Sequence, residues 1–224
     1  MSNKNAYLFW VFPVVVGGLI AIQSLVLSHI PTGIIGISWE AVSDLLVFLP
    51  VSVYFLWQMS RIIDPNNKYS TWFLILIGVY IVGIGIHLSS NQIHNVLDIP
   101  SISGDASKAA YVWDELIGHW LIHLGLAGSL YLLAKVSQIN LSGGRIVYGI
   151  TGFLLGVFLA VAAIEGHSIW IYAACCLLVW KTFYKSQIND IKLYILSSTA
   201  GIVILLIAWY LIFNSFIEPS VLLK

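Results

Sequence analysis

Apolar residues fall into long runs along this chain, and each run is bounded by a short polar segment. A helix needs about 20 such residues to cross the hydrocarbon core of a bilayer, which is ~30 Å thick. The first run lacks a small-residue cleavage site, so we expect it to be retained as a helix. The pattern predicts an all-α, polytopic membrane protein in which residues 1–224 form a single domain of seven transmembrane helices. The predicted spans are 7–28, 38–59, 70–92, 111–134, 145–164, 168–184 and 191–214.

The composition supports this class of protein. Only 9% of the residues are charged and 59% are hydrophobic, whereas soluble domains carry about 25% charged residues. Such a composition excludes a water-soluble globular domain, a disordered chain and a nucleic-acid binder that depends on basic charge. Cys175 and Cys176 are adjacent within an apolar run, so we expect small buried side chains there and no disulfide framework.

The charges at the span ends predict the orientation. With a cytoplasmic N-terminus, the inner segments hold all but two of the ten basic residues, and the positive-inside rule favours this arrangement. The C-terminus is then outside, and all six histidines and most carboxylates fall at the outer ends of the spans. The short loops lead us to expect a multi-pass protein of a prokaryotic plasma membrane. The predicted inner residues are Lys4, Arg61, Lys68, Lys135, Arg145, Lys181, Lys185 and Lys192.

Two polar stripes at helical spacing occupy the outer ends of the third and fourth spans. The first consists of His87, Ser90 or Asn91, His94 and Asp98. The second consists of Glu115, His119 and His123, spaced i, i+4 and i+8. Consecutive antiparallel spans can bring such stripes face to face at one depth. Ionisable groups inside a membrane normally face the bundle interior, a cavity or a partner.

Histidines with a nearby carboxylate are ligands that suit zinc, copper or iron. We expect a bound metal, with His94, His119 and His123 as the first candidate ligands and His87 and His167 as further candidates. Three alternatives remain open: hydrogen-bonded histidine–carboxylate pairs near the headgroups, a haem, and a proton relay. 

Three other polar residues at this level are given simpler interpretations. We predict that His29 is an interfacial residue before a turn. Glu40 and Asp44 are predicted to belong to a solvated helix start, with a place in the same cavity as the alternative.

Three short motifs resemble those of the CREST superfamily, which contains the alkaline ceramidases and the adiponectin-receptor-like proteins. They are Ser90-x-x-x-His94, Asp114-Glu115-Leu116 and His119-x-x-x-His123, and the resemblance covers residues 87–125. It implies that His94, His119 and His123 bind zinc, that Asp114 holds the zinc-bound water and that Ser90 supports the site. It also implies hydrolysis of lipid amide bonds.

Two hypotheses about function follow. The first is a membrane-embedded hydrolase, with zinc as its metal, that cleaves an amide or ester bond of a membrane lipid at the outer leaflet. Asp114 or Glu115 would act as general base for a metal-bound water. The alternative is a subunit of a larger membrane complex, of the monooxygenase type, with a copper or other redox metal or a structural histidine cluster. Its partners would be other membrane subunits, and nitrogen-rich sites do bind Cu²⁺ more tightly than Zn²⁺.

Overall fold

The computed structural model describes residues 7–25, 27, 32, 37–63, 68–97, 104–136, 144–184 and 186–222. Within these residues the protein is all-helical, without a β-strand. Five single helices are α1 (Leu8–Leu25), α4 (Ser70–Leu97), α7 (Arg145–Glu165), α8 (Ile169–Phe183) and α9 (Asp190–Phe213). A short helix, α10 (Pro219–Leu222), follows them.

Two longer helical rods are composite, because a π-helical segment interrupts each of them. One consists of α2 (Trp39–Ser43), the π-helix η3 (Asp44–Phe48) and α3 (Leu49–Ile63). The other consists of α5 (Asp105–Tyr111), the π-helix η4 (Val112–Gly118) and α6 (His119–Val136). The described residues therefore form seven rods at the predicted positions, and their ends differ from the prediction by a few residues.

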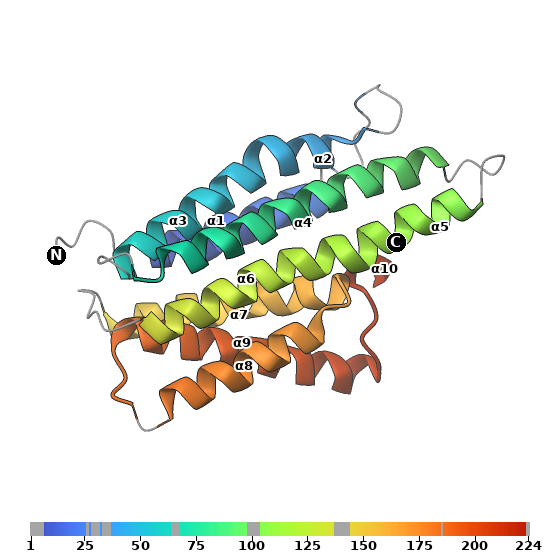
Figure 1. Ribbon diagram of the computed structural model, residues 1–224. Coiled ribbons are helices and arrows are strands. Elements are labelled where there is room, and N and C mark those ends of the chain that lie inside the picture. Colours follow the sequence, from blue (N-terminus) through green and yellow to red (C-terminus); the bar gives the residue numbers. More distant parts are fainter. Residues whose placement is uncertain are drawn as a thin grey trace.

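The rods lie lengthwise beside one another in a bundle (Figure 1). α6 contacts α4 on one side and α8 on the other, and α7 packs closely against α9. The α4–α6 contact is close because glycine lies at the crossing: a Cβ atom added to Gly83 would be 2.5 Å from the backbone nitrogen of Ile122. Small residues allow such close approach between membrane helices.

Five of the rods are long and apolar enough to cross a membrane. These segments are Ala41–Ile62, Ser70–Ile93, Lys108–Val136, Arg145–Glu165 and Asp190–Phe213. α8 and the apolar segment Leu8–Leu19 of α1 are shorter. The structure thus has the composition and helix lengths of a multi-pass membrane protein. A count of seven crossings remains a prediction.

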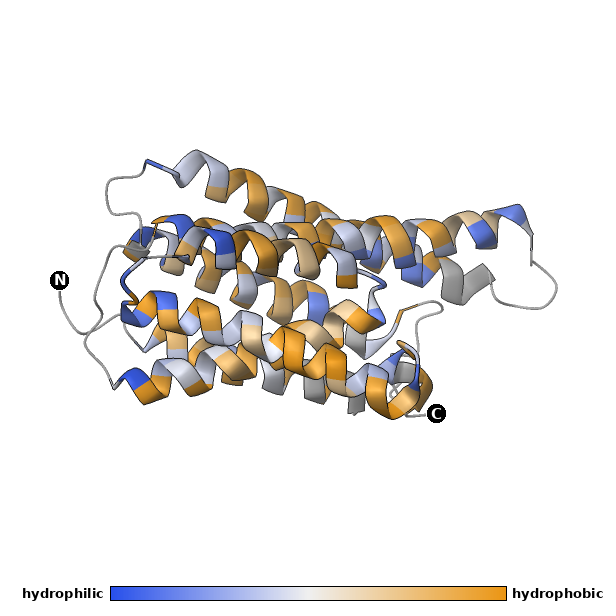
Figure 2. Cartoon of the chain, turned by 90° about the horizontal axis from the view of Figure 1, so that it is seen from below, coloured by the Kyte–Doolittle hydropathy of each residue, from blue (hydrophilic) through white to orange (hydrophobic). Residues whose placement is uncertain are grey.

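The outer surface of the bundle is apolar along its length, and hydrophilic residues gather near its two ends (Figure 2). Large hydrophobic side chains such as Leu46, Ile146, Leu177 and Leu211 are exposed. Such extensive exposed apolar area indicates contact with another apolar phase, and lipid is the phase expected around such a bundle.

Cys175 and Cys176 are buried and form no disulfide, which confirms the expectation for them.

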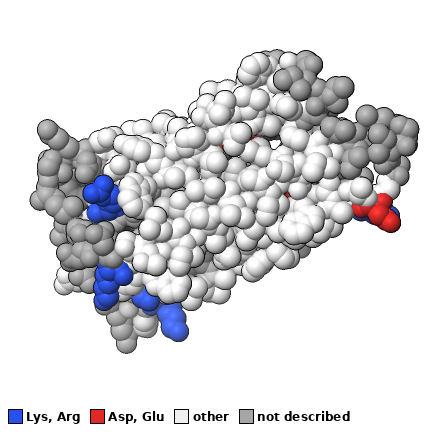
Figure 3. Space-filling model, turned by 45° about the horizontal axis from the view of Figure 1, so that its top comes forward, with Lys and Arg blue, Asp and Glu red and all other residues white. Residues whose placement is uncertain are grey.

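Opposite charges gather at opposite ends of the bundle (Figure 3). Among the described residues, the basic end carries Arg61, Lys68, Lys135, Arg145, Lys181 and Lys192. One acidic residue, Asp190, lies with them and pairs with Arg145 at 3.7 Å. The other end carries Asp105, Asp114, Glu115, Glu165 and Glu218, with Lys108 beside them. This is the partition that the span pattern predicts; which end faces the cytoplasm stays a prediction.

Candidate metal centre

The π-helical segment η4 decides which carboxylate faces the histidines. In η4 the backbone N–H of His119 bonds to the carbonyl of Asp114, five residues earlier. A π-helical turn closes over five residues, whereas an α-helical turn closes over four. Asp114 therefore takes the place one turn before His119 that α-helical spacing assigns to Glu115. Asp114 is buried and Glu115 is half-buried.

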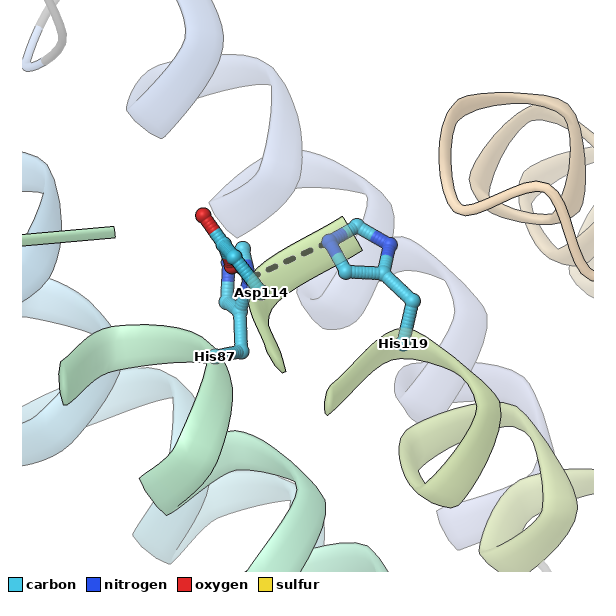
Figure 4. Close-up of polar contacts among 3 residues, drawn as sticks. All are labelled: His87, Asp114 and His119. Carbon is cyan, nitrogen blue, oxygen red and sulfur yellow. Dashed lines mark hydrogen bonds and ion pairs between the residues drawn. The ribbon is translucent and has the colours of Figure 1, made fainter. Parts of the chain in front are cut away.

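His87 of α4, Asp114 of η4 and His119 of α6 converge inside the bundle (Figure 4). The Nδ1 atom of His87 lies 2.5 Å from Oδ1 of Asp114 and 3.1 Å from Nε2 of His119. One possible ligand atom from each residue lies within 4.8 Å of the others. α4 and η4 can approach this closely because Gly118 faces the backbone of His87, where a Cβ atom would be 3.0 Å from the His87 nitrogen.

Three atoms able to bind a metal lie close together: Nδ1 of His87, Oδ1 of Asp114 and Nε2 of His119. A single proton on Nδ1 of His87 can be donated to Asp114 or shared with His119, but it cannot form two good hydrogen bonds at once. A cation between the three atoms would interact favourably with each of them. Tetrahedral metal–ligand bonds of ~2.0–2.1 Å require ligand atoms about 3.3 Å apart. The His87–His119 separation of 3.1 Å is close to this value, and the 2.5 Å separation of His87 and Asp114 would have to lengthen. This group could hold a metal ion.

His119 is held differently at its two ring nitrogens. Its Nε2 atom faces His87, while its Nδ1 atom is buried without a hydrogen-bond partner. The Nδ1 side packs against Gly166 in the turn between α7 and α8, so closely that a Cβ atom on Gly166 would clash with the imidazole. A metal-bound histidine usually donates its second N–H to a carboxylate, a carbonyl or water. Here packing takes the place of such a bond.

His123 lies one turn beyond His119 and is fully buried, but it is outside the converging group. Its Nδ1 atom is 3.0 Å from the hydroxyl of Tyr172 on α8. The ring centroids of His119 and His123 are 6.1 Å apart. The converging group thus contains His87, a further candidate from the sequence, and does not contain His123; the ligand roles of both stay predictions.

The remaining predicted site residues lie around the group. Ser90 is buried on α4, one turn beyond His87, and is not one of the three converging residues. His167 lies in the α7–α8 turn, where its Nε2 atom pairs with Oε1 of Glu218 at 3.0 Å. Glu115 interacts electrostatically with both Asp114 and Glu218. These residues form the rim of the bundle above the metal group.

Several of the residues discussed above lie outside the described part of the chain. His29 is one of them, as are the side chains of His94 and Glu40. The proposed role of His94 as a ligand therefore stays a prediction.

Two residues near the group were not predicted as parts of it, and a third was given only as an alternative. The third is Asp44, which begins η3, is half-buried and lies within electrostatic range of His87; its place in the same cavity stays a prediction. Tyr172 could not be recognised, because a tyrosine in an apolar run has the pattern of an ordinary core residue. Gly166 had a signal: it stands between two polar residues, Glu165 and His167, in a connection between two apolar runs.

Comparison with known proteins identifies no relative. No protein-family model gives a significant match to the chain, and neither does any curated protein or solved structure. The resemblance to the CREST superfamily consequently rests on the three short motifs alone.

Proposed function

We propose that the protein is a membrane-embedded metal hydrolase that cleaves an amide or ester bond of a membrane lipid. The observation that carries this proposal is the proximity of His87, Asp114 and His119, whose possible ligand atoms lie within 4.8 Å of one another. Two histidines and one carboxylate form a ligand set known from catalytic zinc sites, where the fourth position stays open for water or substrate.

The depth of the site supports a lipid substrate. His87 precedes the end of the apolar segment Ser70–Ile93 by six residues (93 − 87), which corresponds to about 9 Å of α-helix. The group therefore lies within the bilayer but close to the level at which acyl chains join the headgroup. A soluble substrate would have to enter an apolar layer to reach it.

When bound, the metal would lower the pKa of a water molecule to ~7 and polarise a carbonyl group. We assign the role of general base to Glu115, because Asp114 is occupied as a ligand and Glu115 is the neighbouring half-buried carboxylate. Ser90, one turn from His87, is proposed to support the site.

Zinc is the metal we propose, and it is the metal that the resemblance to the CREST superfamily implies. The ligand set proposed here differs from the one implied by that resemblance, since His87 and Asp114 stand in place of His94 and His123. By the positive-inside rule the acidic end, and with it the site, would face the outer leaflet of a prokaryotic plasma membrane.

Metal analysis of the purified protein tests the proposal. We expect one zinc ion per chain in the wild type and its loss in His119→Ala. His167→Ala is the matched control, because it removes a histidine at the same end of the bundle but outside the group. Hydrolysis should then be assayed on lipids with amide and ester linkages in mixed micelles. A wild-type protein without bound metal, or hydrolysis that survives His119→Ala, would contradict the proposal.

A redox-metal subunit is the second candidate function. Two histidines and one carboxylate also form the ligand set of non-haem Fe(II) oxygenases, and imidazole suits copper as well. Stoichiometric copper or iron, together with membrane subunits that co-purify and an absence of lipid hydrolysis, would favour this candidate.

A further inference from the structure

His123 is a buried polar residue that the proposed chemistry does not use. It is 3% exposed and lies in the interior between α6 and α8. Burying an imidazole without partners costs free energy, so buried polar side chains are normally hydrogen-bonded. The partners of His123 show what it holds in place.

The two ring nitrogens of His123 face different neighbours. The Nδ1 atom is paired with the Tyr172 hydroxyl at 3.0 Å. The Nε2 atom is on the side of the α7–α8 turn, since it would lie 2.8 Å from a Cβ atom on Gly166. His123 therefore joins Tyr172 on one side to the turn on the other.

Backbone hydrogen bonds shape the turn that His123 faces. The Gly166 N–H bonds to the Ala162 carbonyl at 2.9 Å, and the Ser168 N–H bonds to the Ala163 carbonyl at 2.9 Å. Tyr172 on α8 and His123 on α6 are paired, and His123 packs directly against Gly166 in this turn. This packing helps to fix the position of Gly166.

Gly166 in turn forms the wall behind His119. Its backbone dihedrals are ordinary, with φ −90° and ψ 19°, so the absence of a side chain is required by space and not by conformation. The His119 ring fills that space, and its Nδ1 atom has no hydrogen-bond partner. On its Nδ1 side the orientation of His119 therefore depends on packing against Gly166, while its Nε2 side contacts His87 at 3.1 Å.

We propose that Tyr172, His123 and Gly166 are positioning residues. The Tyr172–His123 pair holds the α7–α8 turn in place, and Gly166 in this turn packs against His119. Together they keep the His119 imidazole in the orientation that binds the metal. This inference rests on the proposed metal site. It assigns a role to a tyrosine and a glycine that touch neither the ion nor the substrate.

Two variants with matched controls test it. Tyr172→Phe removes one oxygen atom from the buried pair, and Tyr194→Phe is its control, because the buried Tyr194 hydroxyl has no hydrogen-bond partner to lose. Gly166→Ala fills the space that His119 occupies. Gly149→Ala, in the helix α7 that leads into this turn, is its control, because the nearest atom to its added Cβ is 3.9 Å away.

The readouts are metal affinity by competition titration and the visible spectrum of the Co²⁺-substituted protein. Changes in residues that support metal ligands typically weaken binding by about 10–100-fold, and we expect this loss in Tyr172→Phe and Gly166→Ala but not in the controls. The Co²⁺ spectrum should shift in the two test variants, which a general loss of stability would not produce. If Gly166→Ala does not fold, Tyr172→Phe carries the test.

Hydrogen exchange at the backbone amides of Gly166 and Ser168 separates this inference from the proposed function. Tyr172→Phe should accelerate their exchange even in metal-free protein. If the wild type binds metal and Tyr172→Phe leaves affinity, spectrum and exchange unchanged, the inference is wrong and the metal site stands. If the wild type binds no metal, the proposed function is wrong. If, in addition, exchange is unchanged in Tyr172→Phe, the proposed positioning of the α7–α8 turn by the Tyr172–His123 pair is wrong as well.

Discussion

Asp114 and Glu115 are neighbours in the chain, but the bundle gives them different surroundings. Asp114 points inward to His87, while Glu115 lies at the rim within the electrostatic range of His167 and Glu218. Two carboxylates in different environments can take different chemical roles. The proposed division is a ligand at 114 and a general base at 115.

Amide replacements should separate these two roles. Asp114→Asn removes the anionic ligand, so we expect loss of the bound metal and of hydrolysis together. Glu115→Gln should keep the metal and reduce kcat by about 10²–10⁴-fold, the usual contribution of a general base. Metal content and steady-state kinetics on the same preparations check both. Loss of metal in Glu115→Gln with retention in Asp114→Asn would reverse the assignment.

The candidate residues could be found from the sequence, but their pairing could not. Histidines gathered at one depth of an apolar chain already indicated a metal group, and both histidines of the converging group, His87 and His119, were candidates. The choice between His87 and His123 depends on which ring finds another partner. That partner is Tyr172, 49 residues away from His123 in sequence, and helical spacing carries no information about such a contact.

At the level of the element, the main difference between the prediction and the structure lies in the π-helical segment η4. The spacing rule assumed α-helical turns and so aligned Glu115 with His119. π-helical segments arise where tertiary contacts compensate for less favourable backbone geometry, and they are frequent at functional sites. In this protein the compensating contact is the close approach of Gly118 to His87. No local pattern in Val112–Gly118 signals this.

The approach of α4 to α6 can be tested at Gly83. Gly83→Ala would place a methyl group against the Ile122 backbone and so separate the two helices that carry the metal group. We expect a loss of about 1–3 kcal/mol in the free energy of unfolding, which is typical of overpacking, and a lower metal content. Gly85→Ala on the same helix is the control, because its added Cβ meets no atom within 4 Å. Thermal unfolding in detergent measures both; equal stability of the two variants would contradict the close contact.

At the scale of the whole molecule, the fold was largely predictable because the bilayer imposes a simple rule. A helix that crosses the bilayer must be apolar over most of its length, and hydropathy located all seven rods of the described chain, five of which are long and apolar enough to cross. The segregation of charge also follows from the sequence, since alternate loops fall at the same end of an up-and-down bundle. The packing of rods against one another depends on glycine positions and side-chain shapes, and it could not be derived in this way.

Orientation in the membrane can be measured with two cysteine variants. Ala106→Cys lies exposed at the acidic end and Gln187→Cys lies exposed at the basic end. Cys175 and Cys176 are buried and should not react. In intact cells we expect a membrane-impermeant thiol reagent to label Ala106→Cys only, and lysis should expose Gln187→Cys. The opposite labelling pattern would place the metal group at the cytoplasmic leaflet.

The α7–α8 turn also limits which amino acids can replace Gly166 and His167. His167 adopts a left-handed backbone conformation with φ 47°, which costs roughly 1–2 kcal/mol for a residue with a Cβ atom. Glycine or asparagine would accept this conformation more readily, whereas every side chain at position 166 meets an imidazole. Two adjacent positions are therefore under opposite constraints. Position 167 can accept glycine or asparagine, whereas at position 166 any residue larger than glycine would clash with the His119 ring.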